Sequence, residues 1–343
     1  MGRKFKVWVI SLVVMCAAMT GLAEESTRKF QKSWPVQEVA TLRINNKFGE
    51  VWINHSGGTM VTVDVLVTVE GSGNRAKEML DDITVTFGKS GGTVSAETEI
   101  KNNFRSKNKL SINYTVNIPS DKNLDVSNKF GNVVLDKLTG KGDIDVAYGN
   151  LRANQLEGPE TNLNVEYGKA DIQRLGNAGV YLAYSKLFLG SGENIQLDVK
   201  YSTVTADKLL SLNLDSKYDS FNFGELVTLK GESKFSNYKI GTLTKILDLT
   251  SAYGTVKVDN VPEDFEQVII QSSYAQISLG IEESTSYQVE AKCDFCDIVY
   301  PSGNFKGRRM KENTSQSLSG KIGGGSGGLV KVTSKFGNIK LVK

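Results

Sequence analysis

Along most of the chain, apolar and polar residues alternate with the period of two that is typical of β-strands. The alternation slips by one position beside an aromatic residue. Val199 precedes Tyr201 by two positions, whereas Val204 follows it by three and is succeeded by Ala206. Such a slip indicates a corner between two strands. Another aliphatic residue, Leu209, comes a few positions later. Three short apolar runs per repeat predict a coil with three sides.

An aromatic residue followed by a small residue marks each predicted corner, and it returns every 17 to 21 residues between Phe130 and Phe295. This period is too short for a helical repeat and suits one turn of a β-solenoid. Stacked coils place equivalent residues about 4.8 Å apart, so we expect a column of stacked rings. Strand parity predicts that most of these rings point inward. The corner aromatics, to which we assign a structural role, are Phe48, Phe130, Tyr148, Tyr167, Tyr184, Tyr201, Tyr218, Phe235, Tyr253, Tyr274, Phe295 and Phe336.

The predicted fold is therefore all-β, with a parallel β-helix of about 17–21 residues per coil over residues 121–343. We expect a right-handed coil, because strand crossovers are right-handed in general. Residues 34–120 show non-repeating strand patterns and one short helix over Asn74–Asp82, and we expect them to cap the solenoid. A final coil over 330–342 is predicted at the far end, where its lysine residues would discourage end-to-end growth.

The first 23 residues have the pattern of a signal peptide, with a basic start, an apolar run and a small-residue site that predicts cleavage after Ala23. A lipoprotein signal that uses Cys16 is the alternative. Either signal predicts export, so the mature chain would be periplasmic, associated with the outer envelope or extracellular. No later segment is apolar enough for a membrane helix.

Removal of this leader changes the charge balance, because it carries three of the 41 basic residues and none of the 38 acidic ones. The mature chain is then close to neutral. Its lysines and arginines do not cluster in sequence as a nucleic-acid footprint requires, so no nucleic-acid partner is expected.

Cys293 and Cys296 flank the corner aromatic Phe295. In an oxidising compartment this spacing favours a disulfide across a tight turn. Free buried thiols and a redox site are the alternatives, although redox C-x-x-C motifs usually begin a helix. A zinc site would need two further ligands, and no histidine is near.

No catalytic cluster stands out. The single histidine, His55, lies in a predicted surface turn, and the glycines at 323–328 lack the sequence context of a phosphate loop. Parallel β-helices can carry enzymes that cleave acidic polysaccharides, but such sites need convergent charged residues in a cleft. The acids considered for such a site are scattered in sequence: Asp143, Asp145, Asp207, Asp215 and Asp219. No metal or cofactor is predicted.

Exposed tyrosine or tryptophan could instead form a platform for sugars. Because parity turns most aromatics inward, a structural role is favoured for them. Trp52, Tyr238 and Tyr300 depart from the corner position and are the residues to inspect for such a platform.

The units at 46–53 and 334–341, each an aromatic-Gly-x-aliphatic-x-aliphatic run, resemble the bacterial putative-adhesin β-strand-repeat family. This group is similar to the head-GIN putative autotransporter adhesins. The resemblance covers most of the mature chain. It implies a secreted or envelope β-helical protein with an adhesive or structural role, and it supplies no catalytic residues.

The sequence thus predicts a non-enzymatic envelope scaffold or binding protein whose partner is a protein or a glycan of the cell envelope. A β-helix enzyme that cleaves acidic polysaccharides is the alternative.

Overall fold

The computed structural model describes residues 25–101, 109–282 and 284–342. Over these residues the chain is all-β with a single α-helix, and that helix is too short and too polar to cross a bilayer. The predicted signal peptide, residues 1–23, lies outside the described residues. The chain divides into two compact units, Met1–Gly149 and Asn150–Lys343. The repeat region predicted from the sequence is therefore shared between the two units.

The first unit combines parallel and antiparallel strands. A short 3-10 helix over Val36–Glu38 follows its first strand. Its elements are β1 (Glu25–Pro35), β2 (Thr41–Lys47), β3 (Val51–His55), β4 (Met60–Glu70), α1 (Gly73–Asp81), β5 (Ile83–Ser90), β6 (Thr93–Ile100), β7 (Leu110–Ile118), β8 (Asn123–Lys129), β9 (Val133–Leu138) and β10 (Gly142–Ala147).

A long insertion separates the first two repeats of this unit in sequence but not in space. β2 pairs in parallel with β8, so that Leu42 lies opposite Leu124. On their other sides, β2 and β3 pair with β6 and β7. The inserted β4 runs antiparallel to β1 and to β7, and β5 runs antiparallel to β6. The insertion therefore forms the non-repeating β region beside β2 and β3.

Helix α1 belongs to this unit, and its own apolar stripe of Ala76, Met79 and Leu80 is buried. It begins at Gly73, one residue before the predicted start, and no side-chain hydrogen bond caps it. Packing of the apolar stripe therefore holds this short helix, since a helix of this length is marginal by itself.

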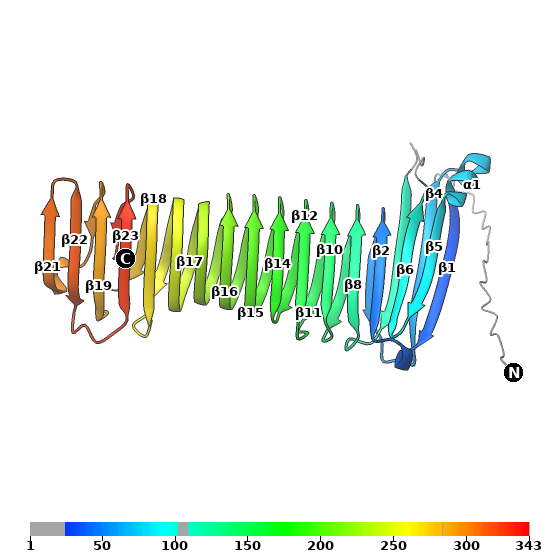
Figure 1. The fold of residues 1–343 in the computed structure, drawn as a ribbon, viewed down its shortest axis with the longest axis horizontal. Helices are drawn as coiled ribbons and strands as arrows, with labels where there is room; N and C mark the ends of the chain where they lie inside the picture. Colours follow the sequence, from blue (N-terminus) through cyan, green and yellow to red (C-terminus); the bar gives the residue numbers. More distant parts are fainter. Residues whose placement is uncertain (1–24, 102–108, 283, 343) are drawn as a thin grey trace. The chain divides into compact units, whose positions relative to one another are not determined.

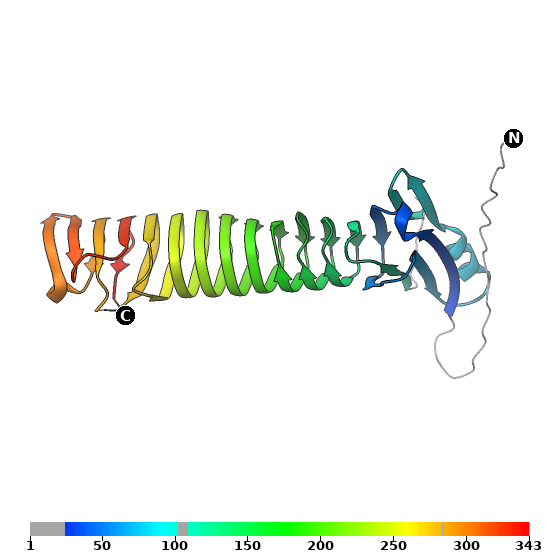
Figure 2. The same ribbon diagram turned by 90° about the horizontal axis from the view of Figure 1, so that it is seen from below.

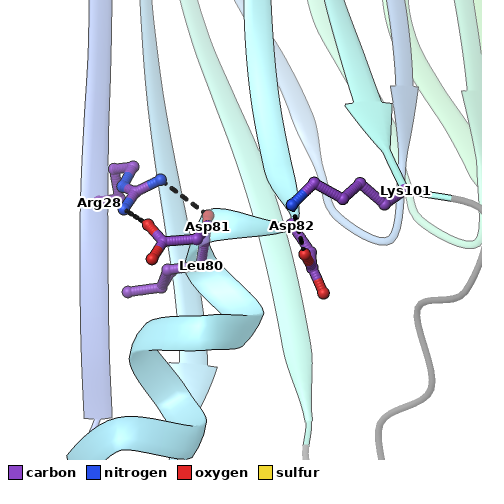
Figure 3. Close-up of polar contacts among 5 residues, drawn as sticks. All are labelled: Arg28, Leu80, Asp81, Asp82 and Lys101. Carbon is purple, nitrogen blue, oxygen red and sulfur yellow. Dashed lines mark hydrogen bonds and ion pairs between the residues drawn. The ribbon is translucent and has the colours of Figure 1, made fainter.

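Charged side chains fasten the end of α1 to its surroundings (Figure 3). Arg28 of β1 donates to the carbonyl of Leu80 over 2.8 Å and forms an ion pair with Asp81. Lys101 forms a second ion pair, with Asp82, over 2.8 Å. A cation beside the last carbonyls of a helix also interacts favourably with the helix dipole.

The second unit consists of strands connected by turns, with one short 3-10 helix over Ser302–Asn304. The strands are β11 (Asn150–Leu156), β12 (Thr161–Glu166), β13 (Lys169–Leu175), β14 (Ala178–Ala183), β15 (Lys186–Lys200), β16 (Thr203–Lys217), β17 (Ser220–Val261), β18 (Gln267–Ile281), β19 (Tyr287–Asp294), β20 (Ile298–Val299), β21 (Phe305–Glu312), β22 (Ser315–Ile322), β23 (Leu329–Lys335) and β24 (Ile339–Lys340).

Most strands of this unit pair in parallel with the equivalent strand of the next repeat, and they lie side by side in Figure 1 and Figure 2. Leu187 of β15 lies opposite Val204 of β16, which lies opposite Phe221 of β17. All three side chains are buried. The register fixes which residues face inward, because a slip of one position would reverse every side chain.

The last two strands along the chain, β23 and β24, do not lie at the end of the sheet, since β24 pairs with β18 and β20. β23 pairs in parallel with both β18 and β19, so that Val330 lies between Val268 and Val289. The antiparallel strands β22 and β21 follow on the other side of β19. The expectation that residues 330–342 form the terminal coil is therefore wrong. The hairpin of β21 and β22 takes the terminal place because β19 offers it an edge with which to pair.

Candidate functional site: an exposed aromatic ladder

The corner aromatics share an unusual backbone conformation. All twelve have positive φ angles, between 52° and 66°. This left-handed conformation costs roughly 1–2 kcal/mol for a residue with a Cβ atom. Hydrogen bonds to the next repeat hold it in place. The N–H of Tyr184 donates to the carbonyl of Lys200 over 3.0 Å, and that of Tyr201 donates to the carbonyl of Lys217 over 3.1 Å.

The corner side chains point outward, with between 38% and 55% of each exposed. The prediction from parity that they point inward is wrong, because a residue with positive φ interrupts the alternation of a strand. The next residue takes the inward place instead, as Ser202 does after Tyr201. The slip in the apolar pattern signalled the corner, but it did not show which of the two residues turns out.

The exposed rings stack on one another. In the first unit Phe130 lies 5.1 Å from both Phe48 and Tyr148, measured between ring centroids. In the second unit the distances are 4.7–5.0 Å and the planes differ by 2–14°. We call this second series the aromatic ladder, and its members in spatial order are Tyr167, Tyr184, Tyr201, Tyr218, Phe235, Tyr253, Tyr274, Phe336 and Phe295.

Stacking decides what the ladder can offer to a ligand. Neighbouring rings cover each other's faces, so the ladder presents ring edges and the phenolic groups of its tyrosines. A pyranose ring therefore cannot stack on a ring face inside the ladder. A shallow groove of about 420 Å³ runs beside Tyr167, Tyr184 and Tyr201, with Ser185 and Lys186 in its lining. The arrangement suits an elongated ligand that lies along the ladder.

A chain of buried hydrogen bonds supports the middle of the ladder from inside. The N–H of Ser185 donates to the hydroxyl of Ser202 over 3.0 Å. The N–H of Ser202 donates to a carboxylate oxygen of Asp219 over 2.7 Å, and the N–H of Asp219 donates to the hydroxyl of Ser236 over 3.2 Å. The side chain of each inward corner residue therefore accepts a hydrogen bond from a backbone N–H of the preceding repeat.

Asp219 is the charged residue of this chain of bonds and is only 3% exposed. Besides the N–H of Ser202, its carboxylate accepts the hydroxyl of Ser216 over 2.7 Å and the N–H of Lys217 over 2.8 Å. Burial raises the pKa of Asp219, and the bonds from Ser216, Ser202 and Lys217 oppose that rise. Because three donors already bind this carboxylate, Asp219 stabilises the corner and is a poor general base.

Glycine corners use a different bonding scheme. The side-chain amide of Asn128 donates to the carbonyl of Gly49 over 2.9 Å, and the hydroxyl of Ser334 donates to that of Gly337 over 2.6 Å. A Cβ atom at Gly131 would lie 1.9 Å from the carbonyl oxygen of Gly49. Here only glycine permits the close approach of adjacent corners.

The structure joins Cys293 and Cys296 in a disulfide, with Cα atoms 5.5 Å apart. Cys293 is buried, and Cys296 occupies the small-residue position directly after Phe295. The bridge therefore ties a strand to its own corner at one end of the aromatic ladder.

The remaining candidates form no common site. His55 is exposed, and its Nδ1 accepts the N–H of Ser120 over 3.0 Å. Asp143 and Asp145 in the first unit, and Asp207 and Asp215 in the second, are exposed on outward strand positions. Within the described ranges, no three histidine, cysteine or acidic residues gather as metal ligands would.

The three aromatics outside the corner position lie in unrelated surroundings. Trp52 is exposed and donates to Glu50 over 2.7 Å. Tyr238 is buried, whereas the ring of Tyr300 lies 5.4 Å from that of Phe305. They do not form a sugar platform together, and the exposed aromatic surface lies at the corners instead.

No family model and no curated protein matches the chain. Among solved structures, it is similar to a "putative cell adhesion protein" from Clostridium sporogenes, with 9% identity, a TM-score of 0.22 and coverage of 92% of this chain and 99% of the other. For a "putative adhesin" from Bacteroides fragilis the values are 10%, 0.31, 92% and 97%. For one from Parabacteroides merdae they are 12%, 0.26, 74% and 92%. These names agree with the family that the repeat units resemble.

Proposed function

We propose that this protein is an exported, non-enzymatic β-solenoid of the cell envelope that binds its partner along the aromatic ladder. The parallel registers support the solenoid, since Lys186 pairs with Thr203 and Thr203 with Ser220, an advance of 17 residues each time. We take the coil as right-handed from the general chirality of parallel crossovers. The basic start and the apolar run of the leader support export.

The observation that carries this proposal is the exposure of the whole series of aromatic rings. Soluble proteins rarely expose a contiguous apolar surface unless it meets a partner. The rings remain outward while the residue beneath them changes from Gly168 to Ser185 to Asp219. The exposed side chain is thus more constant among the repeats than the buried groups that support it.

The partner that suits this surface is an extended glycan or protein segment of the envelope. Ring edges offer apolar contact, and phenolic hydroxyls can both donate and accept hydrogen bonds. Repetition multiplies weak contacts along a single elongated ligand. Neither requirement involves a reactive group, which is why we propose binding rather than catalysis.

Binding of the purified mature chain to isolated envelope fragments tests the proposal. A variant with Tyr184→Ser, Tyr201→Ser and Tyr218→Ser is expected to lose most of its binding. The matched control, Phe188→Ser with Leu210→Ser, removes exposed apolar side chains outside the ladder and should bind like the parent. Equal binding by the ladder variant would remove this surface as the site.

The same preparation can test for enzymatic activity. Incubation with acidic polysaccharides is expected to release no new reducing ends. Reproducible release that disappears on Asp215→Asn would replace the binding proposal with the polysaccharide-cleaving alternative.

A further inference from the structure

The second unit ends in a strand with one unpaired edge. Of the described strands, only β22 pairs with β21, with Arg308 opposite Ser319 and Arg309 opposite Leu318. Figure 1 shows β21 as the outermost strand beside β22. An edge of this kind offers a row of backbone N–H and C=O groups to a further strand.

This edge strand is strongly cationic. Four of its eight residues are basic and exposed, whereas Glu312 at its end is the one acid. Among the described residues, none of the four basic side chains forms an ion pair, although Arg309 lies 6.0 Å above the ring of Tyr300. The four residues are Lys306, Arg308, Arg309 and Lys311.

Charge on both faces of the strand selects the partner. Side chains alternate along a strand, so Lys306 and Arg308 lie on one face and Arg309 and Lys311 on the other. A second copy of β21 would bring like charges together across the new pair, which is unfavourable. The outer strand of the first unit is no better match, because β1 carries Arg28, Lys29 and Lys32.

We propose that β21 is a docking edge for an extended acidic polypeptide segment, which adds to the sheet as a further strand. Backbone hydrogen bonds supply the pairing, as in other cases of strand addition. Acidic side chains on both faces of the added strand meet the cations of β21, and the same cations disfavour the protein's own basic edge strands. This interaction is separate from the aromatic ladder, which presents side chains and no free backbone edge.

A labelled peptide that is as long as β21 and carries glutamates on both faces of the strand, with valines between them, is a direct probe. With the full mature chain, it is expected to bind and to slow hydrogen exchange at the amides of β21. The variant with Arg308→Glu and Arg309→Glu should bind about tenfold more weakly or worse, because each of the two reversals replaces an exposed attraction by a repulsion, and each of these contributions is a fraction of a kcal/mol. The variant Arg308→Lys with Arg309→Lys should retain most of the binding.

A control variant carries Lys230→Glu and Lys234→Glu, which reverse exposed lysines on the interior strand β17, and it should bind like the parent. A peptide of equal charge with alternating prolines cannot form a strand and should not bind. Equal binding of that peptide would replace strand addition with simple attraction to any polyanion. No binding of the first peptide, or self-association of the chain through β21, would also overturn the proposal.

Discussion

The corners of the first unit and those in the middle of the second unit both turn an aromatic side chain outward, but different hydrogen bonds hold the backbone beside it. At Gly49 the carbonyl oxygen accepts a buried side-chain amide from Asn128. At Ser185 the carbonyl accepts the backbone N–H of Thr203 over 3.0 Å, and side-chain oxygens serve the corner N–H groups instead. The aromatic residue keeps its positive φ in both cases. The bond that links its N–H to the next repeat, together with ring stacking, is therefore the common element.

The largest expected effect comes from a side chain placed on a glycine corner. Gly131→Ala forces a Cβ atom to within 1.9 Å of the Gly49 carbonyl, so adjacent corners must separate. We expect a loss of about 3 kcal/mol or more in the free energy of unfolding, measured with urea. Gly57→Ala is the control, because nothing lies within 4 Å of its added Cβ atom. Equal losses in the two variants would show that the close approach is not the reason for glycine at the corner.

The serine and aspartate corners should respond to the loss of polar atoms rather than to added volume. Asp219→Ala leaves the N–H groups of Ser202 and Lys217 and the hydroxyl of Ser216 without their acceptor. A loss of about 2–3 kcal/mol is expected in the same urea experiment. Asp219→Ser reproduces the residue found at Ser202 and should lose clearly less. If alanine and serine behave alike, the bonding chain does not hold the corner.

Removal of one exposed ring should have a smaller effect in either region. Tyr201→Ala gives up stacking on Tyr184 and Tyr218, and we expect a loss of about 1–2 kcal/mol. Tyr201→Gly loses the same stacking but adopts a φ of 52° without strain, so it should be at least as stable as the alanine variant. A much less stable glycine variant would mean that backbone strain at the corner is negligible.

The smallest effect concerns pH. Because burial raises the folded-state pKa of Asp219 above its ordinary value of 3.8, its carboxyl stabilises the fold most below that value. This contribution is lost as the pH rises through the raised pKa. The stability of the parent relative to Asp219→Ser is therefore expected to fall between acidic and neutral pH, as followed by urea unfolding at several pH values. If the stability of the parent relative to Asp219→Ser instead rose with pH, the folded state would lower the pKa of Asp219 rather than raise it.

Much of this architecture could be predicted from local pattern. The alternation around Val204 and Leu187 gave strands with the correct inward face, and both side chains are buried. The insertion over α1 was visible as a helical stripe in a strand-rich region. The unpaired cationic edge was not predicted, because nothing in the sequence of β21 states which strands it meets.

By itself, the sequence determined that the chain is built from strands and that an aromatic residue recurs once in every repeat, since both depend on neighbouring residues. Only the tertiary structure decided that those rings face the solvent, because hydrogen bonds between successive repeats hold the backbone at Tyr201 and its equivalents in the left-handed region. It also decided that β23 lies between β18 and β19. Because β23 pairs with strands that are distant from it in sequence, no local pattern indicates this pairing.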